Sequence, residues 1–161
     1  MGVIFCMKYI KHINTRIGNI IIIEEENKII EIQINKKTKD TNRVQKDTPL
    51  LQKTEKQLKE YFEGRRKKFS VPLNPKGTSF MKSVWTALEE IPYGEVKTYK
   101  QIAEKIGNPK ASRALGMANH KNPIPIIIPC HRVIGSNGKL VGYALGMPIK
   151  KFLLDWEKEN V

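Results

Sequence analysis

Cys130 and His131 stand side by side at the end of the segment Ile126-Ile127-Ile128-Pro129-Cys130-His131. A proline disfavours helical backbone at the residue before it and cannot donate a hydrogen bond, so we expect a sharp turn here. The isoleucines would anchor this turn in the core and leave Cys130 at the mouth of a cleft. A thiol beside an imidazole can be activated as a thiolate nucleophile. Taken alone, such a pair is more typical of a structural cysteine, because free cysteines usually pack as small apolar side chains.

The charge of the chain narrows the classes of partner. Its 161 residues include 29 Lys and Arg against 16 Asp and Glu, a formal net charge of +13. A surplus of this size favours polyanions, nucleic acid first among them, although lysine-rich surfaces also occur in heat-adapted proteins. No apolar run approaches the ~20 residues that a transmembrane helix needs, and lysines interrupt the region where a signal peptide would have its apolar core.

The cysteine count bears on location and on metals. Cys6 and Cys130 lie far apart, which argues against a disulfide framework and for a reducing, cytoplasmic environment. Cys6 and His12 are too few ligands for an N-terminal zinc site. We therefore expect a cytoplasmic protein with no metal and no cofactor that does not enter a membrane.

Residues 1–76 are predicted to form a small strand-rich domain. Asn19–Asn35 has the pattern of a β-hairpin, because two isoleucine-rich runs flank a polar turn at 24–28. In the second run isoleucine alternates with polar residues, as expected for a half-buried strand. The polar stretch 36–47 is expected to be a loop.

A helix should complete this first domain. Thr48 is a suitable N-cap, Pro49 suits the first helical position, and Gly64 can end the helix. The basic run 65–68 that follows is interpreted as a solvated turn. The sequence 74–77, Asn-Pro-Lys-Gly, is a linker, which places a domain boundary between residues 76 and 77.

Residues 77–161 are predicted to be mainly helical. The expected helices run over residues 79–90, 98–106, 110–119 and 148–159. The second and third of these, joined by Gly107-Asn108-Pro109, form a candidate helix-turn-helix. Ser112 and Ala114 are small residues on either side of Arg113, so the third helix can approach a nucleic-acid groove closely.

Three further features belong to this second domain. The glycines of 135–138 indicate a tight hairpin turn after the Cys-His segment, which would form a wing. In the last helix Phe152, Leu153 and Trp156 are expected to face inward, and Glu157 can fold back toward His131. The fold class is therefore α+β, with a strand-rich first domain and a helical second domain containing a winged helix-turn-helix.

These residues together resemble the O6-alkylguanine-DNA alkyltransferase family, whose members repair alkylated guanine in a single turnover. The resemblance is carried by Tyr99, Gly107-Asn108-Pro109-Lys110-Ala111-Ser112-Arg113-Ala114, Asn122-Pro123-Ile124-Pro125, Pro129-Cys130-His131-Arg132-Val133 and Leu153-Leu154-Asp155-Trp156-Glu157. It extends over roughly 78–161. The first domain resembles the family only in its strand-rich character and its final helix.

The resemblance implies a role for each residue of the site. Cys130 would attack the alkyl carbon on guanine O6, His131 would take the thiol proton through a water, and Glu157 would stabilise the imidazolium. Tyr99 would donate a proton or hydrogen bond to the departing base, and Asn122 would hold the cysteine turn.

The resemblance also implies how the substrate is held. The partner would be double-stranded DNA containing O6-alkylguanine, bound by a monomer that flips the damaged base out of the helix. The DNA-contacting residues would be Ser112, Arg113, Ala114 and Tyr99, and the pocket would be lined by Val133, Tyr143, Ala144 and Leu145. O4-alkylthymine is a further expected substrate.

Leu145 departs from the family pattern. Family members usually carry a pair of glycines after the Tyr-Ala or Tyr-Ser of the pocket rim, whereas this chain has Tyr143-Ala144-Leu145-Gly146. The added bulk predicts good repair of methyl adducts and poor reaction with benzyl adducts.

Three other functional classes remain open at this level. A non-catalytic sensor of alkylated bases would share the fold, but such relatives commonly replace the nucleophile that Cys130 supplies. A winged-helix regulator would not need His131 and Glu157. A cysteine hydrolase would need an oxyanion hole, and none is evident in the sequence.

Overall fold

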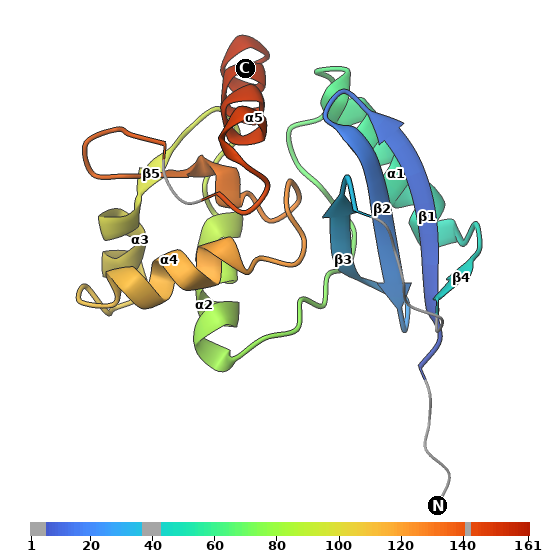
Figure 1. The fold of residues 1–161 in the computed structure, drawn as a ribbon, viewed down its shortest axis with the longest axis horizontal. Helices are drawn as coiled ribbons and strands as arrows, with labels where there is room; N and C mark the ends of the chain where they lie inside the picture. Colours follow the sequence, from blue (N-terminus) through green and yellow to red (C-terminus); the bar gives the residue numbers. More distant parts are fainter. Residues whose placement is uncertain (1–5, 37–42, 141–142) are drawn as a thin grey trace, which may run out of the picture. The chain divides into compact units, whose positions relative to one another are not determined.

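The computed structural model describes residues 6–36, 43–140 and 143–161 (Figure 1). The chain divides into two compact units, Met1–Pro75 and Lys76–Val161. None of the helices in the described ranges is long and apolar enough to cross a membrane.

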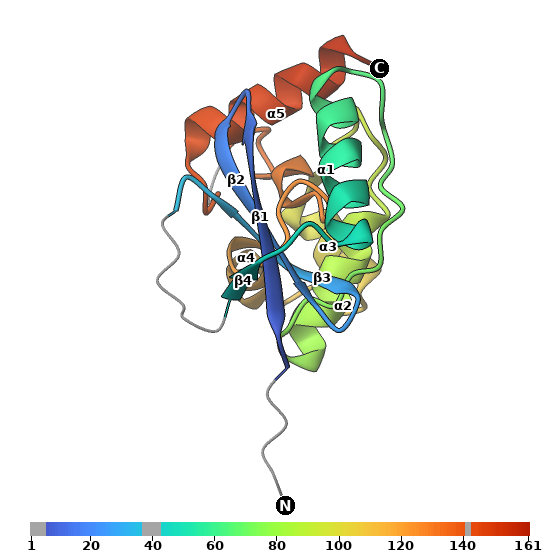
Figure 2. The ribbon, with the colours of Figure 1, turned by 90° about the vertical axis from the view of Figure 1, so that its right-hand side faces the viewer.

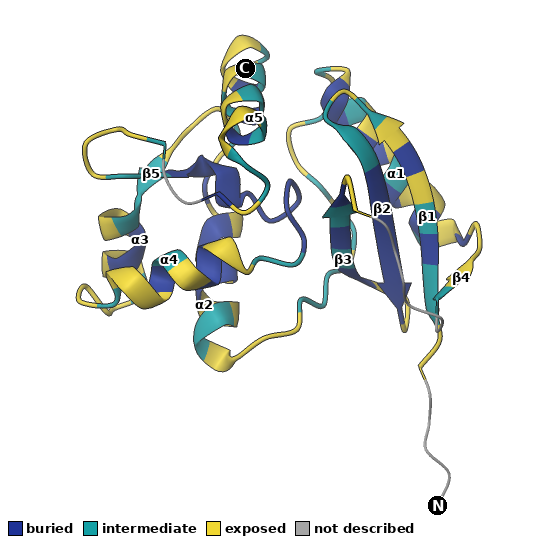
Figure 3. Cartoon of the chain, viewed as in Figure 1, coloured by how far each residue is buried: buried dark blue, intermediate teal, exposed yellow. Residues whose placement is uncertain are grey.

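The first unit is built on a four-stranded sheet with the order β3-β2-β1-β4. Its strands are β1 (Lys8–Thr15), β2 (Gly18–Glu25), β3 (Lys28–Ile34) and β4 (Arg43–Gln45). Strands β1, β2 and β3 pair antiparallel in chain order, and β4 pairs parallel to β1. Isoleucine dominates β2, which is buried along most of its length (Figure 3).

The predicted hairpin is confirmed, but its turn is shorter than expected. Only Glu26 and Asn27 separate β2 from β3, and both have positive φ, 51° and 61°, as a two-residue type I′ turn requires. Glu24 and Glu25 belong to β2 and are buried. The sequence pattern predicted that both lie in the turn, because charged residues rarely occupy a buried strand.

Two strands that the structure describes in the first unit were not predicted. β1 was missed because its buried residues, Ile10 and Ile13, are three positions apart and do not alternate with period two. The expected loop 36–47 contains β4 over Arg43–Gln45, while its residues 37–42 lie outside the described ranges.

Helix α1 (Pro49–Phe62) covers the sheet by packing against β1 and β2 (Figure 2). The Thr48 hydroxyl accepts a hydrogen bond from the Leu51 amide at 3.0 Å, which confirms the predicted N-cap. The same hydroxyl donates to the Glu24 carboxylate at 2.8 Å, so one buried acid of β2 is satisfied by the helix cap.

The second unit contains four α-helices, a 3-10 turn and a small sheet. The helices are α2 (Ser79–Glu89), α3 (Tyr99–Lys105), α4 (Ser112–His120) and α5 (Met147–Glu159), and the 3-10 turn η1 is Cys130–Arg132. Helix α4 packs against α2 and α3. The indole of Trp85 in α2 donates to the Ala118 carbonyl of α4 at 2.9 Å.

The helix-turn-helix is formed by α3 and α4. A capping box begins α3, because the Thr98 hydroxyl accepts from the Gln101 amide while the Gln101 side chain accepts from the Thr98 amide. Gly107, with φ 78°, turns the chain between the two helices. Helix α4 begins at Ser112, two residues later than predicted, since Lys110 and Ala111 complete the turn.

The expected wing takes a different form. The 135–138 turn exists, with a 2.9 Å bond from the Gly138 amide to the Gly135 carbonyl. However, the strand before it, β6 (Val133–Ile134), pairs parallel to β5 (Lys97–Thr98). No strand follows this turn among the residues that the structure describes.

The inner face of α5 also differs from the prediction. Leu153 is buried as expected, but Phe152 and Trp156 are half-exposed and stack on each other with ring centroids 6.1 Å apart. The buried stripe instead contains Lys150, Leu153 and Glu157, which recur at helical spacing. Two charged residues are therefore carried into the interior of this unit.

Candidate active site

A tightly bonded loop delivers Cys130. The Asn122 side chain donates to the Ile128 carbonyl at 2.8 Å and accepts from the Ile124 amide at 3.0 Å. Between these points Ile126 is buried and has φ 75°, a conformation that is rarely adopted by a β-branched residue. Surrounding hydrogen bonds must hold such a residue in place, so the loop before Cys130 stores strain.

The 3-10 turn η1 separates the side chains of three consecutive residues. A 3-10 helix has three residues per turn, so neighbouring side chains point about 120° apart. Cys130, His131 and Arg132 are 3%, 0% and 6% exposed, and η1 packs against α5 and α2. The turn thus places a thiol, an imidazole and a guanidinium in the interior, each facing a different direction.

Glu157 of α5 binds two members of this turn. His131 Nε2 lies 2.6 Å from Glu157 Oε2, and Arg132 donates from Nε to Oε1 at 2.7 Å and from Nη2 to Oε2 at 3.1 Å. Burial would raise the pKa of the Glu157 carboxyl, but the bonds from His131 and Arg132 outweigh it and lower the pKa to about 2. Glu157 is therefore ionised at neutral pH.

The ionised carboxylate fixes the tautomer of His131. Glu157 can only accept, so His131 Nε2 must carry the proton and Nδ1 keeps its lone pair. Nδ1 is buried and has no hydrogen-bond partner among the residues that the structure describes. Burial lowers the pKa of His131, Glu157 opposes that shift, and the charges of Arg132 and Lys150 add to it. At rest His131 is a neutral base with one open nitrogen.

The surroundings of Cys130 both oppose and support its ionisation. Burial raises the pKa of the thiol, whereas the Asn122 amide, the Lys150 ammonium and the Tyr143 hydroxyl act to lower it. The net shift is upward, so the resting group is a thiol. Ionisation consequently needs a base at the moment of reaction.

Lys150 is a charged residue of the site that was not predicted from the sequence. It is fully buried in α5, donates from Nζ to the Val133 carbonyl at 2.6 Å, and lies 5.7 Å from the centre of the Tyr143 ring. Burial lowers its pKa to about 8, against a smaller opposing effect from Cys130. Its spacing from Leu153 and Glu157 is the signal that could have placed it on the buried face of α5.

Tyr99 occupies the first position of α3 and is half-buried. Burial raises the pKa of its phenol, a hydrogen bond with the Asn119 side chain lowers it, and the neighbouring Cys130 raises it. The Asn119 amide also donates to the Cys130 carbonyl at 3.4 Å. Tyr99 and Cys130 are thereby brought to the same site from different elements.

The expected pocket residues all follow the turn η1 in the chain, in β6 and in the segment before α5. Val133 is fully buried in β6, and Tyr143 is buried with its pKa raised well above the ordinary value, chiefly by burial and then by the nearby Cys130. Ala144 is exposed and Leu145 is half-buried in the turn that precedes α5. This turn is closed by a 3.1 Å bond from the Gly146 amide to the Tyr143 carbonyl.

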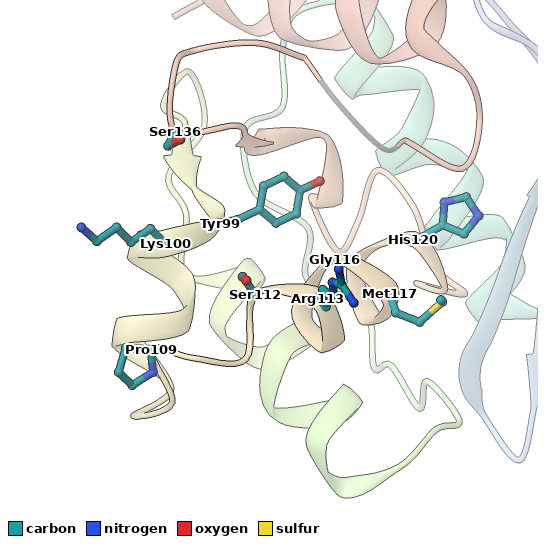
Figure 4. Close-up of a pocket in the computed structure, with 9 residues that line it drawn as sticks. All are labelled: Tyr99, Lys100, Pro109, Ser112, Arg113, Gly116, Met117, His120 and Ser136. Carbon is teal, nitrogen blue, oxygen red and sulfur yellow. The ribbon is translucent and has the colours of Figure 1, made fainter.

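A groove of about 860 Å³ runs over the helix-turn-helix. Figure 4 shows its lining: Tyr99 and Lys100 from α3, Ser112, Arg113, Gly116, Met117 and His120 from α4, Pro109 between them, and Ser136. Tyr99 turns inward while Lys100 points away. Ser112, Arg113 and Ala114 are all exposed at the start of α4. The groove carries basic groups, and Tyr99 links it to the cysteine site.

The next feature concerns side chains that can bind metal ions, and it applies to the described residues alone. Within the described ranges, no group of three or more His, Cys, Asp or Glu side chains is placed to hold a metal ion. Cys6 is exposed and Cys130 is buried, and neither forms a disulfide.

The fold and the site define a helix-turn-helix module with a buried cysteine beside a His–Glu pair, and a second, sheet-based module. Residues 79–159 match the 6-O-methylguanine DNA methyltransferase DNA-binding domain, and residues 7–75 match the ribonuclease-like domain of the same proteins. The chain belongs to the 6-O-methylguanine DNA methyltransferase family.

Individual relatives agree with this assignment. The chain is 48% identical over 159 residues to the constitutive methylated-DNA–protein-cysteine methyltransferase of Bacillus subtilis, covering 94% of this chain and 96% of that protein. It is 66% identical over 102 residues to the methylated-DNA–protein-cysteine methyltransferase of Methanosarcina acetivorans, covering 63% and 65%. A crystal structure of Mycobacterium tuberculosis OGT in complex with DNA superposes with a TM-score of 0.88 at 40% identity, covering 95% and 94%.

Proposed function

We propose that this protein repairs O6-alkylguanine in duplex DNA by moving the alkyl group once, and irreversibly, to Cys130. The family assignment supports DNA repair by alkyl transfer. One geometric observation carries the assignment of the residues: the 2.6 Å contact of His131 Nε2 with Glu157 leaves Nδ1 as an open acceptor in the turn that holds Cys130.

The reaction begins with a proton transfer from the thiol. Cys130 and His131 are consecutive in η1 and point in different directions, so the proton passes from Sγ to His131 Nδ1 through a bridging water. The imidazolium that forms is stabilised by the Glu157 carboxylate, as in other Cys-His-carboxylate arrangements. The Lys150 ammonium and the Asn122 amide support the thiolate.

The alkyl group then moves by direct displacement. The Cys130 thiolate forms a sulfur–carbon bond as the bond between the alkyl carbon and guanine O6 breaks, and the electron pair of that bond stays on the base. Tyr99 donates a proton to the departing guanine, which leaves as a neutral base, and the proton held by the His131 imidazolium balances the negative charge left on the Tyr99 phenolate. A thioether is a poor leaving group, so no water restores the thiol and each molecule reacts once.

The groove on α3 and α4 is proposed to bind the DNA. Its basic residue Lys100 suits a phosphate contact, and binding of this kind depends strongly on salt. Exposed Ser112 and Ala114 allow α4 to approach the minor groove, where Arg113 would fill the space left by the flipped base. Val133, Tyr143, Ala144 and Leu145 would surround that base.

We further propose a cytoplasmic location, a monomeric state, no cofactor and activity on O4-alkylthymine. The two cysteines do not form a disulfide, which supports a reducing compartment. The reaction as written uses only side chains of one chain.

Intact mass spectrometry tests the proposed function. The protein is mixed with duplex DNA containing one O6-methylguanine, alongside Cys130→Ala and Cys6→Ala variants. We expect a gain of one methylene equivalent that persists in Cys6→Ala and is absent in Cys130→Ala. Tight binding of lesion DNA without any mass gain would instead identify a sensor of alkylated bases.

A further inference from the structure

Arg132 connects the catalytic turn to two other elements of the second unit. Its guanidinium donates twice to Glu157 of α5 and once, from Nη1, to the Ile91 carbonyl at 2.7 Å. The same group lies 5.7 Å from the centre of the Tyr93 ring. Arginine presents a rigid planar fork that matches a carboxylate, so these contacts fix direction as well as distance.

The fork controls which way the Glu157 carboxylate faces. Arg132 Nε binds Oε1, and Nη2 binds Oε2, the same oxygen that contacts His131 Nε2 at 2.6 Å. Rotation of the carboxylate would break the two bonds to arginine together. The imidazole therefore receives its orientation from Arg132 through Glu157.

The charge of Arg132 also matters to the base. A buried carboxylate at 2.6 Å would, by itself, favour a protonated imidazole that could not accept the thiol proton. The charged groups that act on His131 are Glu157 and Lys150 from α5 and Arg132 from its own turn. Two cations thus oppose one anion, and Arg132 is the one that contacts the anion directly.

We propose that Arg132 is a positioning residue for alkyl transfer, which aims Glu157 at His131 and keeps His131 neutral and ready to accept a proton. The role rests on the alkyl-transfer function proposed above. Arg132 does not touch the substrate or the reacting sulfur in this scheme, and acts through its two neighbours.

The test compares neutral and charged replacements. Arg132→Met and Arg132→Gln remove the charge, and Gln retains one donor; Arg132→Lys keeps the charge and loses the fork. Arg66→Met is the matched control, because Arg66 pairs with Glu60 in the first unit. For each variant, single-turnover methyl transfer is followed by mass spectrometry across pH. The His131 ring is titrated by NMR, and Tm is measured.

The expected pH dependence differs between variants that keep the positive charge at position 132 and variants that lose it. Both neutral variants should move the acid limb of the rate profile, and the His131 titration, to higher pH by about one unit. Arg132→Lys should leave both within a few tenths of a unit but lower the plateau rate, because it keeps the charge and loses the fork that aims Glu157. Arg66→Met should change neither the pH dependence nor the plateau rate. All three Arg132 variants should lower Tm, because each loses bonds to Glu157 or Ile91.

A purely structural role would lower Tm and leave the acid limb and the titration in place, which would overturn the proposal. A downward shift in the neutral variants would overturn it as well, since it would mean that the charge of Arg132 does not keep His131 neutral. If one of the two neutral variants fails to fold, the rate profile and the His131 titration of the other still test the proposal. Wild-type protein that gains no mass would reject the alkyl-transfer function, while the NMR titration would still decide the role of Arg132.

Discussion

Replacing Glu157 with glutamine keeps the shape of the side chain and removes its charge. Glu157 is fully buried and holds both His131 and Arg132. The amide of glutamine would leave the buried guanidinium without its counter-ion, and would have a single oxygen left to accept bonds from both partners. We therefore expect a loss of stability at neutral pH together with a loss of alkyl transfer.

The size of the loss follows from the pKa of the carboxyl. That pKa falls from an ordinary 4.5 to about 2 in the folded protein. Since one pKa unit corresponds to about 1.4 kcal/mol, the ionised carboxylate contributes on the order of 3 kcal/mol. Breaking a buried ion pair by removing one partner costs about 3–5 kcal/mol, which agrees. For a chain of this length the expected decrease in Tm is roughly 10 °C.

The pH dependence separates the charge from other effects of the substitution. A folded-state pKa below the unfolded value means that the stabilisation is fully present above pH 4.5 and is lost as the pH falls toward 2. The Tm difference between wild type and Glu157→Gln should therefore shrink across this window. Glu159→Gln, the same change at an exposed site of α5, should shift Tm by less than about 2 °C at any pH.

Thermal melts by circular dichroism over this pH range are the assay. A Tm difference that stays constant from neutral pH down to about pH 3 would refute the reasoning, because at pH 3 the unfolded carboxyl is already protonated and a large part of the stabilisation by the folded carboxylate should be lost. The buried His131 adds a separate acid sensitivity. Its pKa is lowered on folding, so protonation favours the unfolded state as the pH falls below the ordinary value of 6.5.

Four further predictions concern the rest of the site. Lys150→Met should slow methyl transfer roughly tenfold, because it removes a cation near the thiolate, and should barely change Tm. The exposed control Lys151→Met should keep the wild-type single-turnover rate. An unchanged rate in Lys150→Met would contradict the prediction. Leu145→Gly should increase inactivation by free O6-benzylguanine, because it removes the side chain expected to hinder benzyl groups. Rapid inactivation of the wild type would disprove the argument that Leu145 hinders them. Met117 is 53% exposed beside the groove, so Met117→Ala should weaken DNA binding severalfold without changing the salt slope, measured by fluorescence anisotropy. Methylation of Cys130 should lower Tm by several degrees, since the added carbon crowds a packed site; equal melting of reacted and free protein would argue against this.

The local patterns of the sequence were sufficient for much of the second unit. Thr78 and Thr98 are the N-caps of α2 and α3, and each side chain accepts the amide hydrogen bond that is typical of a threonine at this position. Glu157 was correctly expected to reach His131, because helical spacing after Leu153 places it on the same buried face. Asn122 bonds the turn before Cys130, as the resemblance implied. These features depend on neighbours within a few residues or on a strongly marked motif.

Other features depend on partners that are remote in the chain. β4 is three residues long and exists because it pairs with β1, more than thirty residues earlier. β6 finds its partner in β5, so the glycine turn after it does not define the strand pairing. Arg132 and Lys150 read as surface charges by type, and only the distant Ile91, Glu157 and Val133 make their burial possible.

The buried charges explain why the site is both costly and well ordered. Burying an ion without a partner costs several kcal/mol, and this interior holds a guanidinium, a carboxylate and an ammonium within one small unit. Arg132 and Glu157 satisfy each other, whereas Lys150 is satisfied largely by a carbonyl and is held at a pKa of about 8. That imbalance leaves net positive charge around a thiol whose own burial opposes ionisation. The positive charge therefore stabilises the Cys130 thiolate more than the resting thiol. Its effect appears as the thiolate forms, which is when the reaction needs it.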